Sequence, residues 1–156
     1  MSPEDFGRYL AMARRTNAFS EDEIAVLDEV LRACAEAPGR DYTLLDAEEC
    51  GIAGGFLIYG PTPMTDFAFD LYWIVVDPSQ QRKGVGLALD DAMCAALLAG
   101  AERAVIRVET AGRSDYDGQR HFYERAAYRE CGRIPNFYSE GDDLVLYCKE
   151  IRRHID

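Results

Sequence analysis

Residues Leu71 to Leu89 read Leu-Tyr-Trp-Ile-Val-Val-Asp-Pro-Ser-Gln-Gln-Arg-Lys-Gly-Val-Gly-Leu-Ala-Leu. The unbroken aromatic and β-branched run at the start predicts a strand that is buried on both faces. Asp77 and Pro78 end this strand, because proline has no N–H to give to a ladder and restricts the residue before it. Apolar residues at helical spacing follow from Val85 onward. The stretch therefore predicts a strand, a glycine-containing loop and a helix, and the rest of the chain is organised around it.

The loop between this strand and this helix has the composition of an anion-binding site. The first turn of a helix leaves backbone N–H groups unpaired, and the aligned peptide dipoles add partial positive charge there. Glycine lacks the Cβ atom that would keep an anion away from those groups, and an arginine and a lysine add charge at the mouth. The loop therefore predicts a phosphate or pyrophosphate site. Its residues are Gln81, Arg82, Lys83, Gly84, Val85, Gly86 and Leu87.

The composition narrows the class of protein. A chain of 156 residues that is 48% hydrophobic predicts one domain, residues 1–156, with a sizeable core. No apolar run approaches the ~20 residues of a membrane span, and the N-terminus does not have the pattern of a signal peptide. The net charge of −11 argues against nucleic acid and anionic membranes as partners.

The acidic charge is concentrated in one half of the chain. The first 78 residues carry 15 acidic and five basic side chains, a balance of −10, whereas the remainder is nearly neutral. The acidity therefore lies away from the predicted phosphate loop. A highly charged helical surface is the simple explanation for most of it.

The cysteines and histidines do not form a recognisable framework. Five cysteines are an odd number with no short pairing, and the two histidines lie far apart, so neither a disulfide framework nor a metal site is predicted. Reduced, small core residues are the preferred interpretation, and a cytoplasmic location follows from it. The cysteines are Cys34, Cys50, Cys94, Cys131 and Cys148.

The hydrophobic pattern predicts the element order ααβββαβαββ. Two helices come first, one ending near Arg15 and one beginning at a capping box that runs from Ser20 to Glu23. Strand-like segments at 42–45 and 51–59 are predicted to form a hairpin, and a long strand at 67–76 follows. The remaining segments are a helix ending near Gly100, a strand at 104–110, a short helix at 121–127 and closing strands at 128–134 and 144–151. This order predicts an α/β fold with a mixed central sheet flanked by helices.

The loop and the element order together resemble one family. The spacing Gln81-x-x-Gly84-x-Gly86, directly after a buried strand ending in Val-Asp-Pro, resembles the acyl-CoA signature of the GNAT superfamily of N-acetyltransferases. It is neither a Walker loop nor Gly-x-Gly-x-x-Gly. Nearly the whole chain fits the GNAT element order, except that the usual first strand has no candidate before the first helix. The resemblance implies a GNAT fold, acetyl-CoA as donor and a primary amine as acceptor.

A second match lies in the later half of the chain. The run from His121 to Tyr128, His-Phe-Tyr-Glu-Arg-Ala-Ala-Tyr, resembles the family's helix on the far side of the CoA groove. Alanine stands at position 127, where the family usually has glycine. By this resemblance Tyr123 protonates the leaving thiolate. The alternative is that Tyr123 is a core residue of an amphipathic helix.

The resemblance also assigns the acyl-bearing arm of CoA to a strand. The buried strand is expected to diverge from its neighbour, so that the pantetheine arm can hydrogen-bond to its backbone like an added strand. The corresponding residues are Ile74, Val75 and Val76. A backbone N–H there would also hold the oxyanion that forms as the amine attacks.

An amine acceptor needs a group that accepts its proton, because at pH 7 it is mostly ammonium. Glu109, on the strand after the CoA helix, is the candidate base, directly or through water. The alternative is that Glu109 is a solvent-facing strand residue, and Asp70 and Glu140 are weaker candidates for the base. No cysteine lies beside a histidine in the context of a nucleophile, which disfavours a covalent enzyme intermediate and favours a ternary complex.

Other functions stay open at this point. One is a module that binds acetyl-CoA without turnover, and another is a transferase that uses a different acyl-CoA or a hydroxyl acceptor. The acidity of the first 78 residues suggests a cationic acceptor. The sequence does not identify the acceptor, and it leaves open whether the chain forms a homodimer.

Overall fold

The computed structural model describes residues 3–51, 54–113 and 117–154. Within these ranges the elements follow the predicted order. The helices are α1 (Pro3–Arg15), α2 (Glu21–Glu36), α3 (Val85–Gly100) and α4 (Asp117–Arg125), with short 3₁₀ turns η1 (Ala47–Cys50) and η2 (Pro78–Gln80). The strands are β1 (Thr43–Asp46), β2 (Gly55–Pro61), β3 (Ala68–Val76), β4 (Arg103–Ala111), β5 (Arg129–Ser139) and β6 (Asp142–Arg152).

The strands form one mixed sheet in the order β1-β2-β3-β4-β6-β5. All neighbouring strands are antiparallel except β3 and β4, which are parallel. Helices α1 and α2 cover one face of β2 and β3, and α3 and α4 cover the other face of the sheet. The predicted α/β fold with a mixed sheet flanked by helices is confirmed.

Helix α3 packs directly on β2 because β2 begins with a glycine. A Cβ at Gly55 would lie 2.8 Å from Cγ1 of Val85 and 3.1 Å from Cδ1 of Leu89. Leu89 and Met93 are fully buried beneath the sheet, and burying each such side chain contributes roughly 1.5–3 kcal/mol. This contact fixes the N-terminal end of α3 beside the end of β3.

Several element boundaries differ from the sequence prediction. Strand β2 begins at Gly55 rather than at residue 51, because η1, capped by the Asp46 side chain (Glu48 N to Asp46 Oδ1, 2.9 Å), ends at Gly51 in the left-handed conformation with φ +76°. The closing strands are longer than predicted, and the turn that joins them contains Gly141 with φ +79°. Among the described strands, β1 forms one edge of the sheet and β5 the other.

Helix α4 ends in a Schellman motif whose left-handed residue is an alanine. The Tyr128 N–H donates to the Tyr123 carbonyl (2.9 Å), and the Ala127 N–H donates to the Glu124 carbonyl (3.1 Å). Ala127 has φ +66°, a conformation that disfavours a residue with a Cβ by roughly 1–2 kcal/mol. Glycine is the usual residue at this position, so the helix end carries local strain.

We expect Ala127→Gly to raise the free energy of unfolding by about 0.5–1 kcal/mol, because it relieves this strain while the greater freedom of the unfolded chain offsets part of the gain. Urea denaturation measures the change. The neighbouring Ala126→Gly is the matched control and should lower stability, because Ala126 is buried. Equal losses in the two variants would contradict the strain at Ala127.

Candidate active site

Strands β3 and β4 diverge after three paired residues. Their register consists of Ala68 with Val105, Phe69 with Ile106 and Asp70 with Arg107. Beyond these pairs β3 continues to Val76 and β4 to Ala111, without further pairing to each other. The facing edges therefore carry backbone N–H and C=O groups that the sheet does not use.

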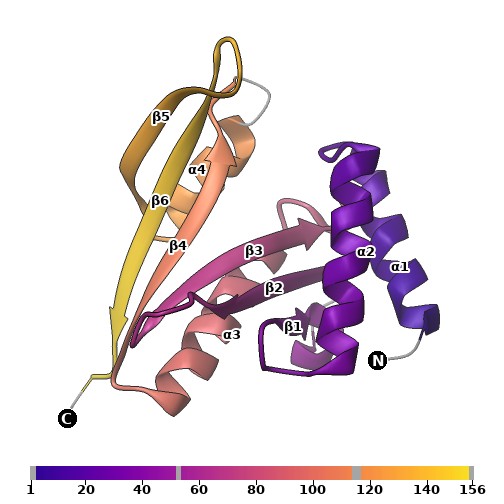
Figure 1. Cartoon of the computed structure of the whole chain (residues 1–156). Coiled ribbons are helices and arrows are strands. Elements are labelled where there is room, and N and C mark those ends of the chain that lie inside the picture. Colours follow the sequence, from indigo (N-terminus) through magenta and orange to yellow (C-terminus); the bar gives the residue numbers. More distant parts are fainter. Residues whose placement is uncertain (1–2, 52–53, 114–116, 155–156) are drawn as a thin grey trace.

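A bulge in β3 marks the point of divergence. Ile58 of β2 pairs with Trp73 and Tyr59 pairs with Leu71, so Tyr72 is an extra residue on β3. A bulge bends its strand and increases the local twist. Figure 1 shows the result, with β4, β6 and β5 forming one arm and β2 and β3 running toward α1 and α2 as the other.

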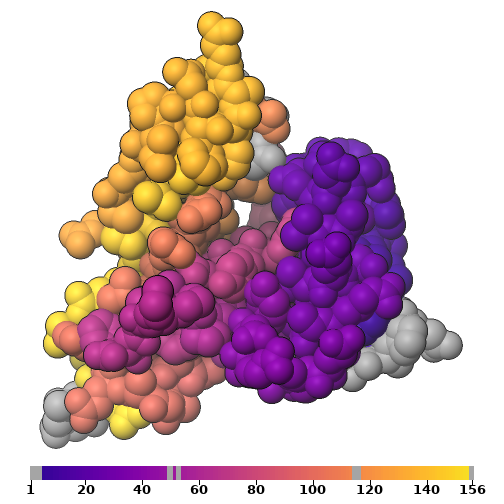
Figure 2. Space-filling model, viewed as in Figure 1, coloured from indigo at the N-terminus to yellow at the C-terminus, as the bar shows by residue number. Residues whose placement is uncertain are grey.

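The space-filling view shows an opening between these two arms. In Figure 2 it lies between the orange and yellow lobe of β5 and β6 and the indigo lobe of α1 and α2, above the magenta β3. Ile74, Val75 and Val76 belong to the diverging part of β3 and pair only with β2. Val75 is buried, so the backbone of this segment, rather than its side chain, is the part offered to a ligand.

The loop after β3 leads to a helix start without a side-chain cap. The N-cap residue of α3 is Gly84 with φ +79°, and no atom lies within 4 Å of a Cβ built there. The Ala88 N–H bonds the Gly84 carbonyl at 3.0 Å, so the preceding N–H groups of the first turn have no helical partner. Helix α2 is different, because Ser20 and Glu23 cap it reciprocally.

The approach to α3 is exposed and basic. Gln81, Arg82, Lys83 and Gly84 are exposed, and Arg82 also has a positive φ, +63°. A loop with left-handed residues of this kind directs successive backbone N–H groups into a shared concavity, which suits an anion. Leu87 is 37% exposed on the first turn of α3. The loop can therefore hold a phosphate group with backbone donors and two cationic side chains.

The second glycine of the loop has a packing role that the sequence did not reveal. A Cβ at Gly86 would lie 2.9 Å from Cε2 of Phe122 on α4. Val85, beside it, is buried against β2. Gly86 therefore lets α4 approach α3 closely, next to the loop.

Tyr123 lies on the buried face of α4 within an aromatic cluster. Its ring centroid is 5.5 Å from that of Phe122 and 5.7 Å from those of Tyr128 and Tyr147. Burial, together with the charge of Asp90, raises the pKa of the Tyr123 phenol, so it is a protonated donor at neutral pH. Only 6% of the Tyr123 surface is exposed, within the core on this side of the sheet.

Glu109 and Tyr123 lie on opposite sides of β4. Glu109 is exposed between the buried Val108 and Thr110, so strand alternation places it on the face away from α4. No ion pair holds it within the described part of the chain. Strand β4 therefore separates the side chain of Glu109 from that of Tyr123.

The two weaker candidates for the base lie in other settings. Asp70 is bound at 2.8 Å by the Thr62 hydroxyl and at 2.6 Å by Nε of Arg107. This pairing keeps the Asp70 carboxylate engaged and raises the pKa of Arg107. Glu140 lies exposed in the turn at the tip of the β5–β6 hairpin.

Two functional candidates were missed by sequence reasoning. The buried Thr110 hydroxyl has no partner among the described residues, and it faces the α4 side of β4 near the divergence. A polar residue within an apolar buried alternation was the available signal. Asp77 joins α1 to the loop, because Arg15 Nη2 lies 2.5 Å from its carboxylate, and hydrogen bonds from Arg15 and Ser79 lower the pKa of Asp77 to about 2. No local pattern links Arg15 to Asp77.

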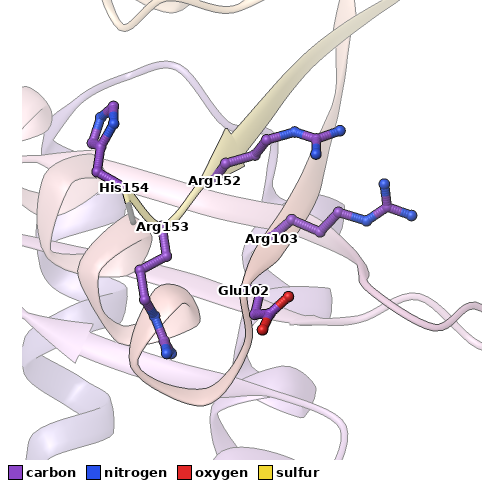
Figure 3. Close-up of a pocket in the computed structure, with 5 residues that line it drawn as sticks. All are labelled: Glu102, Arg103, Arg152, Arg153 and His154. Atoms are coloured by element: carbon purple, nitrogen blue, oxygen red, sulfur yellow. The ribbon is translucent and has the colours of Figure 1, made fainter. Parts of the chain in front are cut away.

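A cavity of about 500 Å³ lies at the opposite end of β4 and β6. Figure 3 shows Arg103 and Arg152 extending side by side there, while Arg153 turns away from them. Nε of Arg153 donates to the Leu98 carbonyl at 3.0 Å, and the guanidinium of Arg103 lies 3.8 Å from the centroid of the Phe67 ring. These arginines therefore cap α3 and pack on an aromatic ring, and the cavity is separate from the opening.

Three further findings concern the described residues. They contain no cluster of three metal-ligating side chains, and none of their helices is long and apolar enough to cross a membrane. Cys34, Cys94, Cys131 and Cys148 are free thiols. The cytoplasmic location stays a prediction.

Similar folds occur among solved structures. The chain shares 30% sequence identity and a TM-score of 0.85 with a protein from Desulfovibrio desulfuricans assigned to the GNAT family of acetyltransferases, over 96% of this chain and 94% of that one. An aminoglycoside 6'-N-acetyltransferase in complex with coenzyme A has a TM-score of 0.74 at 15% identity, over 99% and 95% of the two chains. The ribosomal-protein-S18-alanine N-acetyltransferase of Escherichia coli has a TM-score of 0.70 at 20% identity, over 100% and 94%. Family models and curated protein sequences give no match.

Proposed function

Since the chain belongs to the GNAT superfamily of N-acetyltransferases, we propose that it transfers an acetyl group from acetyl-CoA to a primary amine. The amine attacks the thioester directly, within a ternary complex of enzyme, donor and acceptor. No covalent acetyl-enzyme forms in this scheme, because direct attack needs only a proton acceptor, an oxyanion site and a proton donor for the sulfur.

The observation that carries this proposal is the divergence of β3 and β4 next to the uncapped start of α3. The pantetheine arm is an extended chain with two amides, and it can hydrogen-bond to the free strand edges like an added strand. The backbone of Ile74, Val75 and Val76 would supply one edge. The unpartnered hydroxyl of Thr110 on the facing strand would supply a further hydrogen bond.

The pyrophosphate of the donor would occupy the loop at the start of α3. The absence of a side-chain cap at Gly84 and the exposure of Arg82 and Lys83 support this placement. Gly86 would permit the approach of both the anion and Phe122. The residues proposed to hold this part of the donor are Gln81, Arg82, Lys83, Gly84, Val85, Gly86 and Leu87.

Glu109 and Tyr123 would divide the proton transfers between the two faces of β4. Glu109 would accept the ammonium proton from the exposed face, directly or through water, so that the neutral amine attacks the thioester carbonyl. The tetrahedral oxyanion would be held by a backbone N–H of the diverging segment of β3. Collapse of the intermediate expels the thiolate, and Tyr123 would protonate its sulfur from the buried face.

The acceptor would enter on the side of α1 and α2. The segment between these helices reaches β3, where the ring of Phe19 lies 5.0 Å from that of Trp73, and Tyr72 is 43% exposed nearby. The charge balance of −10 in the first 78 residues favours a cationic amine with an apolar neighbour.

Screening amines with acetyl-CoA, and following the release of free thiol, tests the proposed function. We expect turnover with cationic amines and a decrease in kcat/KM as salt is added. Turnover that favoured acidic peptides and rose with salt would contradict the cationic acceptor. CoA binding without thiol release for any amine or hydroxyl compound would identify a binding module instead, and competition between acyl-CoA donors tests the choice of acetyl group.

For Glu109→Gln we expect kcat/KM at pH 7 to fall at least tenfold, because the variant cannot accept the ammonium proton. The loss should shrink as pH rises toward the pKa of the acceptor amine, since the free amine then needs no base. A pH–rate profile of both proteins measures this. The matched control is Glu102→Gln, an exposed glutamate before the far end of the same strand, and a pH-independent loss in Glu109→Gln would contradict the role of base.

A further inference from the structure

A buried polar network joins α3, β6 and the segment between α4 and β5. Asp90 on α3 and Lys149 on β6 form an ion pair of 2.5 Å, with side chains 2% and 10% exposed. The Tyr128 hydroxyl donates to the other carboxylate oxygen at 2.8 Å. The ammonium group of Lys149 also lies 4.5 Å from the centroid of the Tyr128 ring. Both charges are therefore paired and hydrogen-bonded, as buried charges must be.

The same network holds the C-terminal end of α4. Nζ of Lys149 donates to the Ala126 carbonyl at 2.9 Å, which is one of the carbonyls left without a partner at a helix end. The Tyr128 N–H donates to the Tyr123 carbonyl at 2.9 Å. Asp90 thus reaches the backbone of Tyr123 through the side chain and the N–H of one residue.

Helix α4 depends on such anchors because it is short. It has nine residues, and isolated helices below ~12–15 residues are marginal in water. In its N-terminal half Nη1 of Arg120 donates to the Ala111 and Arg113 carbonyls, both at 2.9 Å. Tyr123 lies between the two anchors, so both determine where its hydroxyl lies.

We propose that Asp90 is a positioning residue, which through Lys149 and Tyr128 fixes α4 against α3 and so sets the place of the Tyr123 hydroxyl relative to the donor. The inference rests on the proposed function and deepens it. Helix α3 would hold the pyrophosphate at its N-terminus, and α4 would carry the proton donor for the sulfur at the other end of the same ligand. A direct link between the two helices keeps the spacing constant.

A second observation agrees with this role. Burial, and after it the Asp90 charge, raises the pKa of the Tyr123 phenol, so the network acts on this hydroxyl electrostatically as well as through the backbone. Apolar residues of similar volume would give equal or better stability than a buried ion pair. The network instead supplies directional bonds, which orient a helix more sharply than apolar packing does.

The test compares Tyr128→Phe with Tyr9→Phe. Each removes one buried tyrosine hydroxyl that donates to an aspartate, Asp90 at 2.8 Å or Asp46 at 2.6 Å. Tyr9 lies on α1, away from α4. We expect similar losses of stability, but kcat about tenfold lower only in Tyr128→Phe, with KM for acetyl-CoA unchanged, because a displacement of about 1 Å at a reacting group lowers rates by up to ~10²-fold.

A second variant guards against misfolding. Asp90→Asn combined with Lys149→Met removes the charge pair together, so no unpaired charge stays buried, and Asn can still accept from Tyr128. A folded double variant should also lose about tenfold in kcat. Wild-type kcat in both folded variants would overturn the proposal.

Deuterium exchange supplies a readout that needs no turnover. The amides of α4 should exchange faster in Tyr128→Phe than in wild type or Tyr9→Phe. Unchanged exchange in α4 overturns the anchoring role, whether or not an acceptor has been found. A wild-type protein inactive with every amine would refute the proposed function, while the exchange data would still decide whether the network holds α4.

Discussion

Tyr123→Phe should lower kcat by about 10²- to 10⁴-fold, the range in which a general acid contributes. The substitution removes only the hydroxyl, and the ring keeps its contacts with Phe122, Tyr128 and Tyr147. The affinity for acetyl-CoA should stay near normal, because the proton is needed as the thiolate leaves rather than when the donor binds. Single-turnover kinetics measure the chemical step, and calorimetry measures donor affinity.

Tyr59→Phe is the matched control for this variant. Tyr59 is buried in the same core, on β2. It should keep kcat within about twofold, since it does not reach the site. If Tyr123→Phe were folded and its single-turnover rate were near that of wild type, Tyr123 would be a core residue only.

Gly84→Val should raise the Kd for CoA by about 10²-fold or more. A branched side chain at the start of α3 would block backbone N–H groups from the pyrophosphate, and each hydrogen bond to a charged group contributes about 1.5–3 kcal/mol. The substitution also strains the backbone, because φ is +79° at this position. Valine should therefore lower stability by roughly 1–2 kcal/mol as well.

Gly39→Val separates the two effects. Gly39 has φ +78°, and no atom lies within 4 Å of its added Cβ, as at Gly84. It should lose a similar amount of stability and keep full affinity for CoA. Equal Kd values for the two folded variants, measured by calorimetry, would show that the loop at Gly84 does not hold the donor.

The part of the fold that could be predicted from the sequence is the part specified by local patterns. The buried run of β3, the stop at Asp77 and Pro78, and the apolar spacing after Val85 each act within a few residues, so the strand, the loop and the helix were all predicted. The predicted start of β2 was wrong by four residues, because Gly51 adopts the left-handed conformation after the 3₁₀ turn and pairing with β3 begins at Gly55.

In the candidate site, too, local patterns pointed to some residues, whereas contacts between distant residues were not predicted. The resemblance assigned Tyr123, the need for a base selected Glu109, and the chemistry of a glycine-containing helix start pointed to the loop residues. Those assignments stay predictions, now with a geometry attached to them. The network around Asp90 was not predicted, because Lys149 is 59 residues away in the sequence. An aspartate within a helix is typical of a solvated face, and only the packing of α3 against β6 shows that Asp90 is buried.

The short pairing of β3 with β4 has a consequence for the order in which substrates bind. Trp73 of β3 contacts the segment between α1 and α2, and together they form one wall of the proposed acceptor entrance. Glu109, on the other side, is a residue of β4. Backbone pairing joins β3 and β4 over three residue pairs only. Beyond those pairs, the distance between the two walls depends on what lies between the strands, and this is the proposed place of the donor. Acetyl-CoA, hydrogen-bonded between the strands, would fix this distance. The acceptor should therefore bind second, and initial-rate kinetics should show an ordered sequence with the donor leading.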